Sequence, residues 1–264
     1  MARRNYGTKK RKRRGRLGVV YSFICFVAIG FAVFFTLSIF FKVKTIAVEG
    51  VSTVSAESVR SASQILIGDN MFLLNKTTIT RNIAKELSYV ESVRIRRKLP
   101  STVVIEVEES RAVGALPYGG GYWLFTGSGK LLSSVNEAAL PGDIPVVRGV
   151  TLLMPQAGAE MALSDSDSDK QAPLFELLGA LTAAEMLDNT QVLDISKVFD
   201  VRFTYDNRLN IVLGMPVELE YKFRFLDEVL SQRSAHERAT VDVSQVTTLD
   251  SMGRKQAARV IVEG

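Results

Sequence analysis

The pattern of hydrophobic and polar positions is dominated by one uninterrupted apolar stretch, Leu17–Phe41, which contains no charged residue. At about 1.5 Å per residue, a helix of this length crosses the ~30 Å hydrocarbon core of a bilayer. Backbone amides inside lipid must be satisfied within their own segment, so a single span has to be helical. The sequence therefore predicts a transmembrane helix over residues 17–41, with residues 1–16 on one side and the rest on the other.

After this stretch the pattern changes to short segments with strand and helix periodicities. Lys42–Glu49 is rich in β-branched residues and ends at Gly50, which is typical of a strand. Two amphipathic helices follow, the first capped by Ser55 and the second beginning near Thr77. Their expected apolar stripes are Val59, Ala62 and Leu66 in the first helix and Ile79, Ile83 and Leu87 in the second.

Two strands complete this region, Val90–Arg97 and Thr102–Glu109, joined at Leu99-Pro100. Arginines alternate with apolar residues in the first strand, and glutamates do so in the second. Antiparallel pairing would place these opposite charges face to face and favour one register. The order β-α-α-β-β within about 70 residues predicts a small α+β domain with helices on one sheet.

Beyond Arg111 the chain has shorter strands separated by turn signals, which predicts a mixed β-sheet domain with flanking helices. The expected strands are 122–125 and 130–133 around the turn Thr126–Gly129, the extended segment 140–149, a hairpin of 198–205 and 208–213 across Asp206-Asn207, and the final strands Ala239–Val246 and Ala257–Val262. The expected helices are 173–187, with Leu174, Leu177, Leu178 and Leu181 buried, and a later one carrying Leu219, Phe223, Leu226 and Leu230. Residues 154–171 are rich in Ser and Asp, and we expect them to form a long flexible surface loop.

The charge distribution assigns an orientation to the span. The net charge is +5, yet residues 1–16 contain nine Lys and Arg and no acid, so the remaining chain carries a net charge of −4. A basic nucleic-acid-binding domain is therefore not expected. Because Lys and Arg are retained on the cytoplasmic side, we expect a cytoplasmic N-terminus and an extracytoplasmic C-terminus.

A cleaved signal peptide is the alternative interpretation of the apolar stretch. Signal-peptide apolar regions are about 7–15 residues long and precede a small-residue cleavage site, whereas this stretch is longer and ends in Ser38-Ile39-Phe40-Phe41. A retained anchor is favoured. The one cysteine, Cys25, lies inside the span, so no disulfide is expected in the exported part.

Three segments resemble the POTRA domain of the FtsQ/DivIB family, which are single-pass bacterial division proteins. They are FKVKTIAVEGVSTVSAESV, IGDNMFLLN and ELSYVESVRIRRKLPSTVVIEVEE, and they directly follow the span. The residues that carry the resemblance are Ile46, Val48, Gly50 and Val54; Gly68, Asn70, Phe72 and Leu73; and Val90, Val93, Arg96, Pro100, Ile105, Val107 and Glu109. Later, LNIVLG and VDVS resemble family segments of the β-domain, although Ser244 stands where the family has arginine.

The resemblance implies a basic cytoplasmic tail over residues 1–16, a transmembrane helix over 17–41, a POTRA domain over 42–111 and an FtsQ/DivIB-type β-domain over 112–264. It implies a scaffold for septal peptidoglycan synthesis, with FtsB/DivIC-like and FtsL-like partners and only indirect links to the septal synthases. It also implies location in the cell membrane at the division septum. The partner would add a strand to the terminal sheet edge, at residues Arg259, Val260, Ile261 and Val262 with Val241 and Val243 on the neighbouring strand.

Candidate catalytic chemistry is sparse in this sequence. A single histidine, His236, excludes a His-based metal cluster, and neither G-x-S-x-G nor a zinc-protease helix motif occurs. The alternating acids Asp165, Asp167 and Asp169 resemble the start of a calcium loop but lack its glycine and final glutamate. Glu108 and Glu109 fit a solvated strand end better than an acid/base pair. We therefore expect a non-enzymatic protein without cofactor, metal or small-molecule substrate. A membrane-tethered POTRA chaperone or secretion module is the alternative function.

Overall fold

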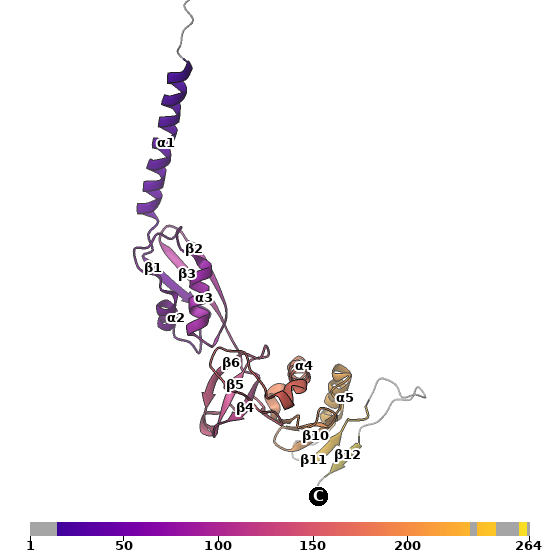
Figure 1. Ribbon diagram of the computed structural model, residues 1–264. Helices are drawn as coiled ribbons and strands as arrows, with labels where there is room; N and C mark the ends of the chain where they lie inside the picture. The colour runs from indigo at the N-terminus through magenta and orange to yellow at the C-terminus, as the bar shows by residue number, and fades with distance from the viewer. Residues whose placement is uncertain (1–14, 233–236, 247–258, 263–264) are drawn as a thin grey trace, which may run out of the picture.

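The computed structural model describes residues 15–232, 237–246 and 259–262 (Figure 1). Its first helix, α1 (Gly15–Phe40), projects away from the remaining chain in Figure 1. Within it, Gly18–Thr36 is long and apolar enough to cross a membrane, and none of this segment is buried against the protein. Large apolar side chains such as Phe26, which is 77% exposed, are therefore left uncovered by the described part of the chain. The predicted N-terminal apolar helix is confirmed.

The domain that follows has the predicted order β-α-α-β-β. Its elements are β1 (Thr45–Glu49), α2 (Ala56–Ser63), α3 (Lys76–Glu86), β2 (Val90–Lys98) and β3 (Thr102–Glu109). The sheet order is β1-β3-β2, with β1 parallel to β3 and β2 antiparallel to β3. The predicted charge pairing is present, because Arg94 lies opposite Glu106 and Arg96 forms an ion pair with the same carboxylate.

Both helices begin at side-chain caps and bury one stripe. The Ser55 hydroxyl accepts a hydrogen bond from the Ser58 N–H, and Asn75 caps α3 through the N–H of Thr78. The buried residues include Val59, Ala62, Ile79 and Ile83 from the helices and Val103, Ile105 and Val107 from β3. One predicted stripe position is wrong: Leu66 is 68% exposed, because α2 ends at Ser63 and Gln64 adopts a left-handed conformation with φ 55°.

A long mixed sheet forms the second domain. Its strands are β4 (Gly114–Tyr118), β5 (Gly121–Phe125), β6 (Leu131–Val135), β7 (Val146–Arg148), β8 (Thr190–Asp194), β9 (Val201–Tyr205), β10 (Leu209–Gly214), β11 (Ala239–Asp242) and β12 (Arg259–Val262). Within the described residues their order is β12-β11-β10-β9-β8-β7-β4-β5-β6. Parallel pairs β4–β7, β7–β8 and β10–β11 interrupt otherwise antiparallel pairing.

Helices α4 (Gln171–Ala183) and α5 (Leu219–Ser231) contact each other and pack on this sheet (Figure 1). The four leucines predicted to be buried in α4 are buried, as are Leu219, Phe223 and Leu226 of α5. The β9–β10 turn is also as predicted, because Asp206 and Asn207 have φ values of 55° and 54°. Aspartate and asparagine tolerate this left-handed conformation better than most residues do. The membrane-anchored α+β fold class is confirmed.

The Ser/Asp-rich segment differs from a solvated loop. Met161 and Leu163 are buried in the core of the second domain, and residues 165–170 form a short 3-10 helix. Asp167 is only 7% exposed, and its carboxylate accepts hydrogen bonds from Thr151 N–H, Ser164 Oγ and Lys170 Nζ at 2.8–2.9 Å. The expectation of a surface position is therefore wrong for these three buried residues. Strands β4 and β8 were not predicted at all.

The two domains contact each other through side chains near the end of α3 and the β5–β6 region. The Tyr89 and Ser133 hydroxyls are 2.6 Å apart, and Lys130 Nζ donates to the Val90 carbonyl at 2.7 Å. Arg111, between the domains, forms an ion pair with Asp188. These hydrogen bonds join the first domain to the sheet that carries the terminal edge.

Candidate functional site: the terminal sheet edge

Strand β12 occupies one end of the long sheet, which is where sequence reasoning placed the partner-binding residues. It pairs antiparallel with β11, so that Thr240 lies opposite Ile261, Val241 opposite Val260 and Asp242 opposite Arg259. In the described part of the chain no strand pairs with the outer side of β12. An unpaired edge presents main-chain donors and acceptors to any extended segment that approaches it.

The predicted site residues divide between the two faces of the sheet. Val241 and Val243 are fully buried, and Val260 packs on the same core. Ile261 is 50% exposed and Arg259 is exposed, so these two side chains lie on the opposite face. For Val262 the structure describes the backbone register, opposite Ala239. The structure thus brings the six residues together at one edge, with only part of them accessible as side chains.

Helix α5 packs on the buried face of the sheet near this edge and is linked to β10 by a buried lysine. Lys222 is 1% exposed, and its Nζ donates to the carbonyls of Leu213 and Met215 at 2.9 Å. Burial lowers the pKa of this ammonium, against the attraction of Glu218 and Asp242. The residue connects α5 to the end of β10, the strand that neighbours β11.

The opposite face of β8–β11 is polar and slightly hollowed. A hollow of about 330 Å³ is lined by residues that include Arg148, Asp194, Arg202 and Thr240. Burial raises the pKa of Asp194, but hydrogen bonds from Ser196 and the nearby arginines outweigh it, so the net pKa is lowered. This face combines opposite charges, and Ile261 lies at its border beside Thr240.

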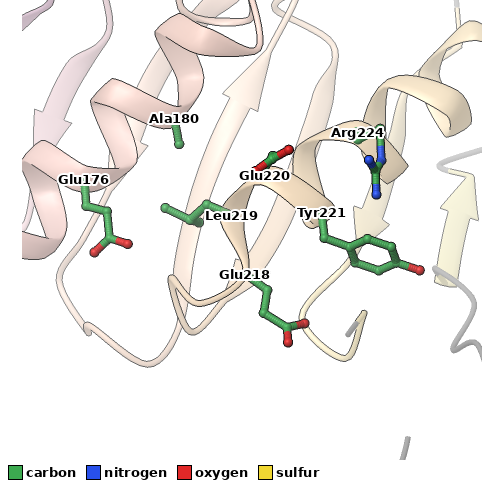
Figure 2. A pocket seen from close by; sticks show the side chains of 7 residues that line it. All are labelled: Glu176, Ala180, Glu218, Leu219, Glu220, Tyr221 and Arg224. Carbon is green, nitrogen blue, oxygen red and sulfur yellow. The ribbon is translucent and has the colours of Figure 1, made fainter. Parts of the chain in front are cut away.

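A second concave region lies between α4 and α5. Figure 2 shows it lined by Glu176 and Ala180 of α4 and by Glu218–Tyr221 and Arg224 at the beginning of α5. The Arg224 guanidinium stands 5.6 Å from the centre of the Tyr221 ring. Three carboxylates and one guanidinium make this groove acidic. It holds no cysteine, serine or histidine nucleophile among its lining residues.

The remaining candidate chemistry is accounted for by structural contacts. Among the described residues no group of three or more His, Cys, Asp and Glu side chains could hold a metal ion. His236 lies outside the described residues. Glu109 binds the 52–54 loop, whereas Glu108 accepts a hydrogen bond from Ser92, so the two carboxylates do not act as a pair.

Sequence reasoning missed the roles of Lys222 and Glu109. The Lys222 position carried a signal, because it shares the helical spacing of Leu219, Phe223 and Leu226 and so belongs to the buried face. Glu109 carried no comparable sequence signal, because its hydrogen-bond partners Ser52–Val54 are more than 50 residues away in sequence.

Comparison with known proteins agrees with this architecture. The family model described as "POTRA domain, FtsQ-type" matches residues 41–110. The chain is 28% identical to cell division protein DivIB of Clostridium acetobutylicum, over 78% of this chain and 80% of the relative. It is 26% identical to DivIB of Clostridium botulinum (89% and 90% covered) and 28% identical to cell division protein FtsQ of Syntrophotalea carbinolica (77% and 67%). The chain thus contains an FtsQ-type POTRA domain behind an apolar N-terminal helix and is similar to DivIB and FtsQ proteins along most of their length, which supports a place in the FtsQ/DivIB family.

Proposed function

We propose that this chain is a membrane-anchored, non-enzymatic cell division protein that recruits partners for septal peptidoglycan synthesis. The names of its DivIB and FtsQ relatives support the role in division. The long apolar helix α1 supports the anchor, and the basic residues 1–16 support a cytoplasmic N-terminus. The POTRA domain (residues 42–111) and the β-domain (residues 112–264) then lie outside the cytoplasm, at the septum.

The partner-binding site in this proposal is the outer edge of β12. The observation that carries it is the absence of any paired strand on that side within the described residues. An FtsB/DivIC-like segment would add as a further strand, with FtsL-like protein in the same complex. Main-chain hydrogen bonds would supply affinity, and the accessible side chains Arg259 and Ile261 would supply specificity. Val241, Val243, Val260 and Val262 would hold the edge in position.

Ile261 is the sharpest probe of this edge, because it is half exposed whereas Val260 packs on the core. The full chain is co-expressed with the FtsB/DivIC-like protein of the same organism and purified from membranes. Ile261→Glu is expected to abolish co-purification while leaving thermal unfolding unchanged. Phe199→Glu, at a 65% exposed apolar residue elsewhere in the same domain, is the matched control and should retain the partner. Full retention of the partner by Ile261→Glu would refute the edge assignment.

The alternative, a membrane-tethered chaperone or secretion module, predicts a different distribution in the cell. A fluorescent fusion of a division protein gathers at midcell, whereas a secretion module labels the membrane evenly. An even label in dividing cells would favour the alternative. The absence of an enzymatic role is tested separately by incubating the purified protein with cell wall, where we expect no turnover.

A further inference from the structure

The POTRA domain exposes its large apolar side chains at one end only. Residues 41–110 are all described, and their exposed large apolar residues form a set that we call the apolar rim. The set comprises Leu66 (68% exposed), Ile67 (66%), Phe72 (47%), Leu73 (74%) and Leu99 (58%). A water-facing domain of this size has no need to concentrate such residues, and apolar patches with polar borders mark interaction surfaces.

The rim lies at the end of the domain where α1 enters. The loop that carries Leu66–Leu73 is hydrogen-bonded to residues 41–43, through Val43 N–H to Asp69 O, Gly68 N–H to Val43 O and Met71 N–H to Phe41 O at 2.8–3.0 Å. The β2–β3 turn that carries Leu99 is held there too, because Lys44 N–H donates to the Ser101 carbonyl at 2.8 Å.

The rim is rigidly built rather than loosely attached. The Phe72 ring packs edge-on against Phe41 with 5.1 Å between centroids, and the Arg97 guanidinium stands 5.9 Å from the centre of the same ring. Arg97 also donates to the carbonyls of Met71 and Leu74. The loop therefore keeps its apolar side chains outward by means of contacts made underneath them.

Distance from the apolar helix limits what these side chains can meet. Helix α1 ends at Phe40, and the backbone contacts of the rim begin at the next residue, Phe41. Consecutive residues are about 3.8 Å apart, whereas the headgroup region of each leaflet is roughly 5–8 Å thick. If α1 spans the membrane, the rim lies within or directly against that region.

Charge around the rim fits a lipid surface. Lys42, Lys44, Lys76 and Lys98 are exposed and lie in or beside the segments that form the rim. These segments contain one acid, Asp69, whose carboxylate accepts a hydrogen bond from the backbone N–H of Leu66, so lysines outnumber acids around the rim. Apolar side chains surrounded by lysines match the boundary between acyl chains and anionic phosphates.

We propose that the apolar rim inserts into the interfacial region of the leaflet at the C-terminal end of α1. The bilayer is thus a second binding partner of the POTRA domain, in addition to the covalent anchor. This contact fixes the orientation of the domain on the membrane and the direction in which the β-domain projects. The inference rests on the proposed function only in requiring that α1 spans a membrane.

Tryptophan quenching by brominated lipid tests this proposal in the full chain reconstituted into phosphatidylglycerol-containing bilayers. Trp123, the one tryptophan, is first replaced by phenylalanine. Leu73→Trp and Leu99→Trp then report separately on two parts of the rim. Phe26→Trp in α1 is the positive control, and Phe199→Trp in the β-domain is the negative control. Circular dichroism and thermal unfolding verify that each variant is folded.

The expected result is a blue-shifted emission that brominated lipid quenches at positions 73 and 99 but not at position 199. Quenching at position 26 without quenching at 73 or 99 would overturn the inference and leave the anchor intact. Lack of quenching at position 26 would overturn the anchor as well. Rim tryptophans that resist lipid quenching but become protected from acrylamide when a membrane-protein extract is added would assign the rim to a protein partner and also overturn the proposal.

Discussion

The carboxylate of Glu109 accepts a 2.6 Å hydrogen bond from the hydroxyl of Ser52, although the two residues are separated by 57 positions in the sequence. The same carboxylate accepts the backbone N–H groups of Ser52, Thr53 and Val54 at 2.8–3.0 Å. The end of β3 thus holds the loop that leads into α2. Burial alone would raise the pKa of Glu109, but these hydrogen bonds outweigh it and lower the pKa to about 2.

Replacing this carboxylate should remove a pH-dependent part of the stability. Because the folded pKa lies below the ordinary value of 4.5, the charged form stabilises the fold above that pH. This stabilisation is lost as the pH falls towards 2. Glu109→Gln should lower the free energy of unfolding by about 1.5–3 kcal/mol at neutral pH and flatten its acid dependence. Denaturant titrations from pH 2 to pH 7 measure this, with Glu108→Gln as control; equal losses in both variants would contradict the assignment.

Gly50 and Gly68 offer a matched comparison of backbone constraint. Both have positive φ, 83° and 100°, but a Cβ on Gly50 would collide with the Val107 carbonyl, whereas a Cβ on Gly68 meets nothing within 4 Å. Gly68→Ala should cost about 1 kcal/mol, from conformational strain alone. Gly50→Ala should cost at least about 2 kcal/mol more, since overpacking is added. Thermal unfolding compares the two, and similar losses would show that the strand end relaxes freely.

Lys222→Met tests the buried ammonium behind the terminal edge. The variant keeps the aliphatic stem but leaves the Leu213 and Met215 carbonyls without this donor, so we expect a loss of about 1–3 kcal/mol. Because the folded pKa is below 10.5, the wild type should gain stability relative to the variant as the pH rises towards that value. Urea titrations from pH 7 to pH 10.5 measure the difference. A constant difference across this range would contradict the lowered pKa.

Asp167→Asn tests whether the Ser/Asp-rich segment is a structural element. The Lys170 ammonium and the Ser164 hydroxyl are the main causes that lower the pKa of Asp167 to about 2. Its stabilisation should be complete above pH 3.8 and disappear towards pH 2. Removing the charge should cost about 1.5–3 kcal/mol, whereas the exposed Asp169→Asn should cost little. Adding calcium or a chelator should not shift either midpoint; a calcium-dependent shift lost in Asp167→Asn would reveal a metal site instead.

The Tyr89–Ser133 hydrogen bond should couple the POTRA domain to the β-domain. A double-mutant cycle with Tyr89→Phe and Ser133→Ala is expected to give a coupling energy of about 0.5–1.5 kcal/mol. Loss of this bond should also increase proteolytic cleavage near Ala112–Val113, between the domains. Strict additivity of the two substitutions would show that the domains do not depend on this contact.

Much of the fold could be predicted because the sequence pattern is strong locally. Ser55 begins a helix by accepting a neighbouring N–H group, and Asp206-Asn207 form a turn whose backbone their side chains tolerate. The predicted burial of Leu66 was wrong because the apolar periodicity continues past Gln64, whereas the left-handed backbone at Gln64 ends the helix. Strand β8 was not predicted from the sequence because its pairing with β7 and β9 defines it more than its own residues do.

At the candidate site, too, the local sequence predicted the strand, whereas the fold decided which side chains are accessible. The β-branched run Arg259–Val262 indicated a terminal strand without help from the fold, since its side chains favour extended backbone. Which residues face water was decided by the sheet, because α5 covers the face that carries Val241 and Val260 and leaves Ile261 half exposed.

By itself the sequence determined the apolar span, the order of elements in the POTRA domain and the family resemblance, since these depend on periodicities and motifs within short segments. The tertiary structure alone decided the carbonyl partners of the Lys222 ammonium, the burial of Asp167, the attachment of Ser52 to Glu109 and the gathering of the apolar rim beside α1. These features require separate strands, helices and loops to pack against one another, and that packing determines which side chains meet.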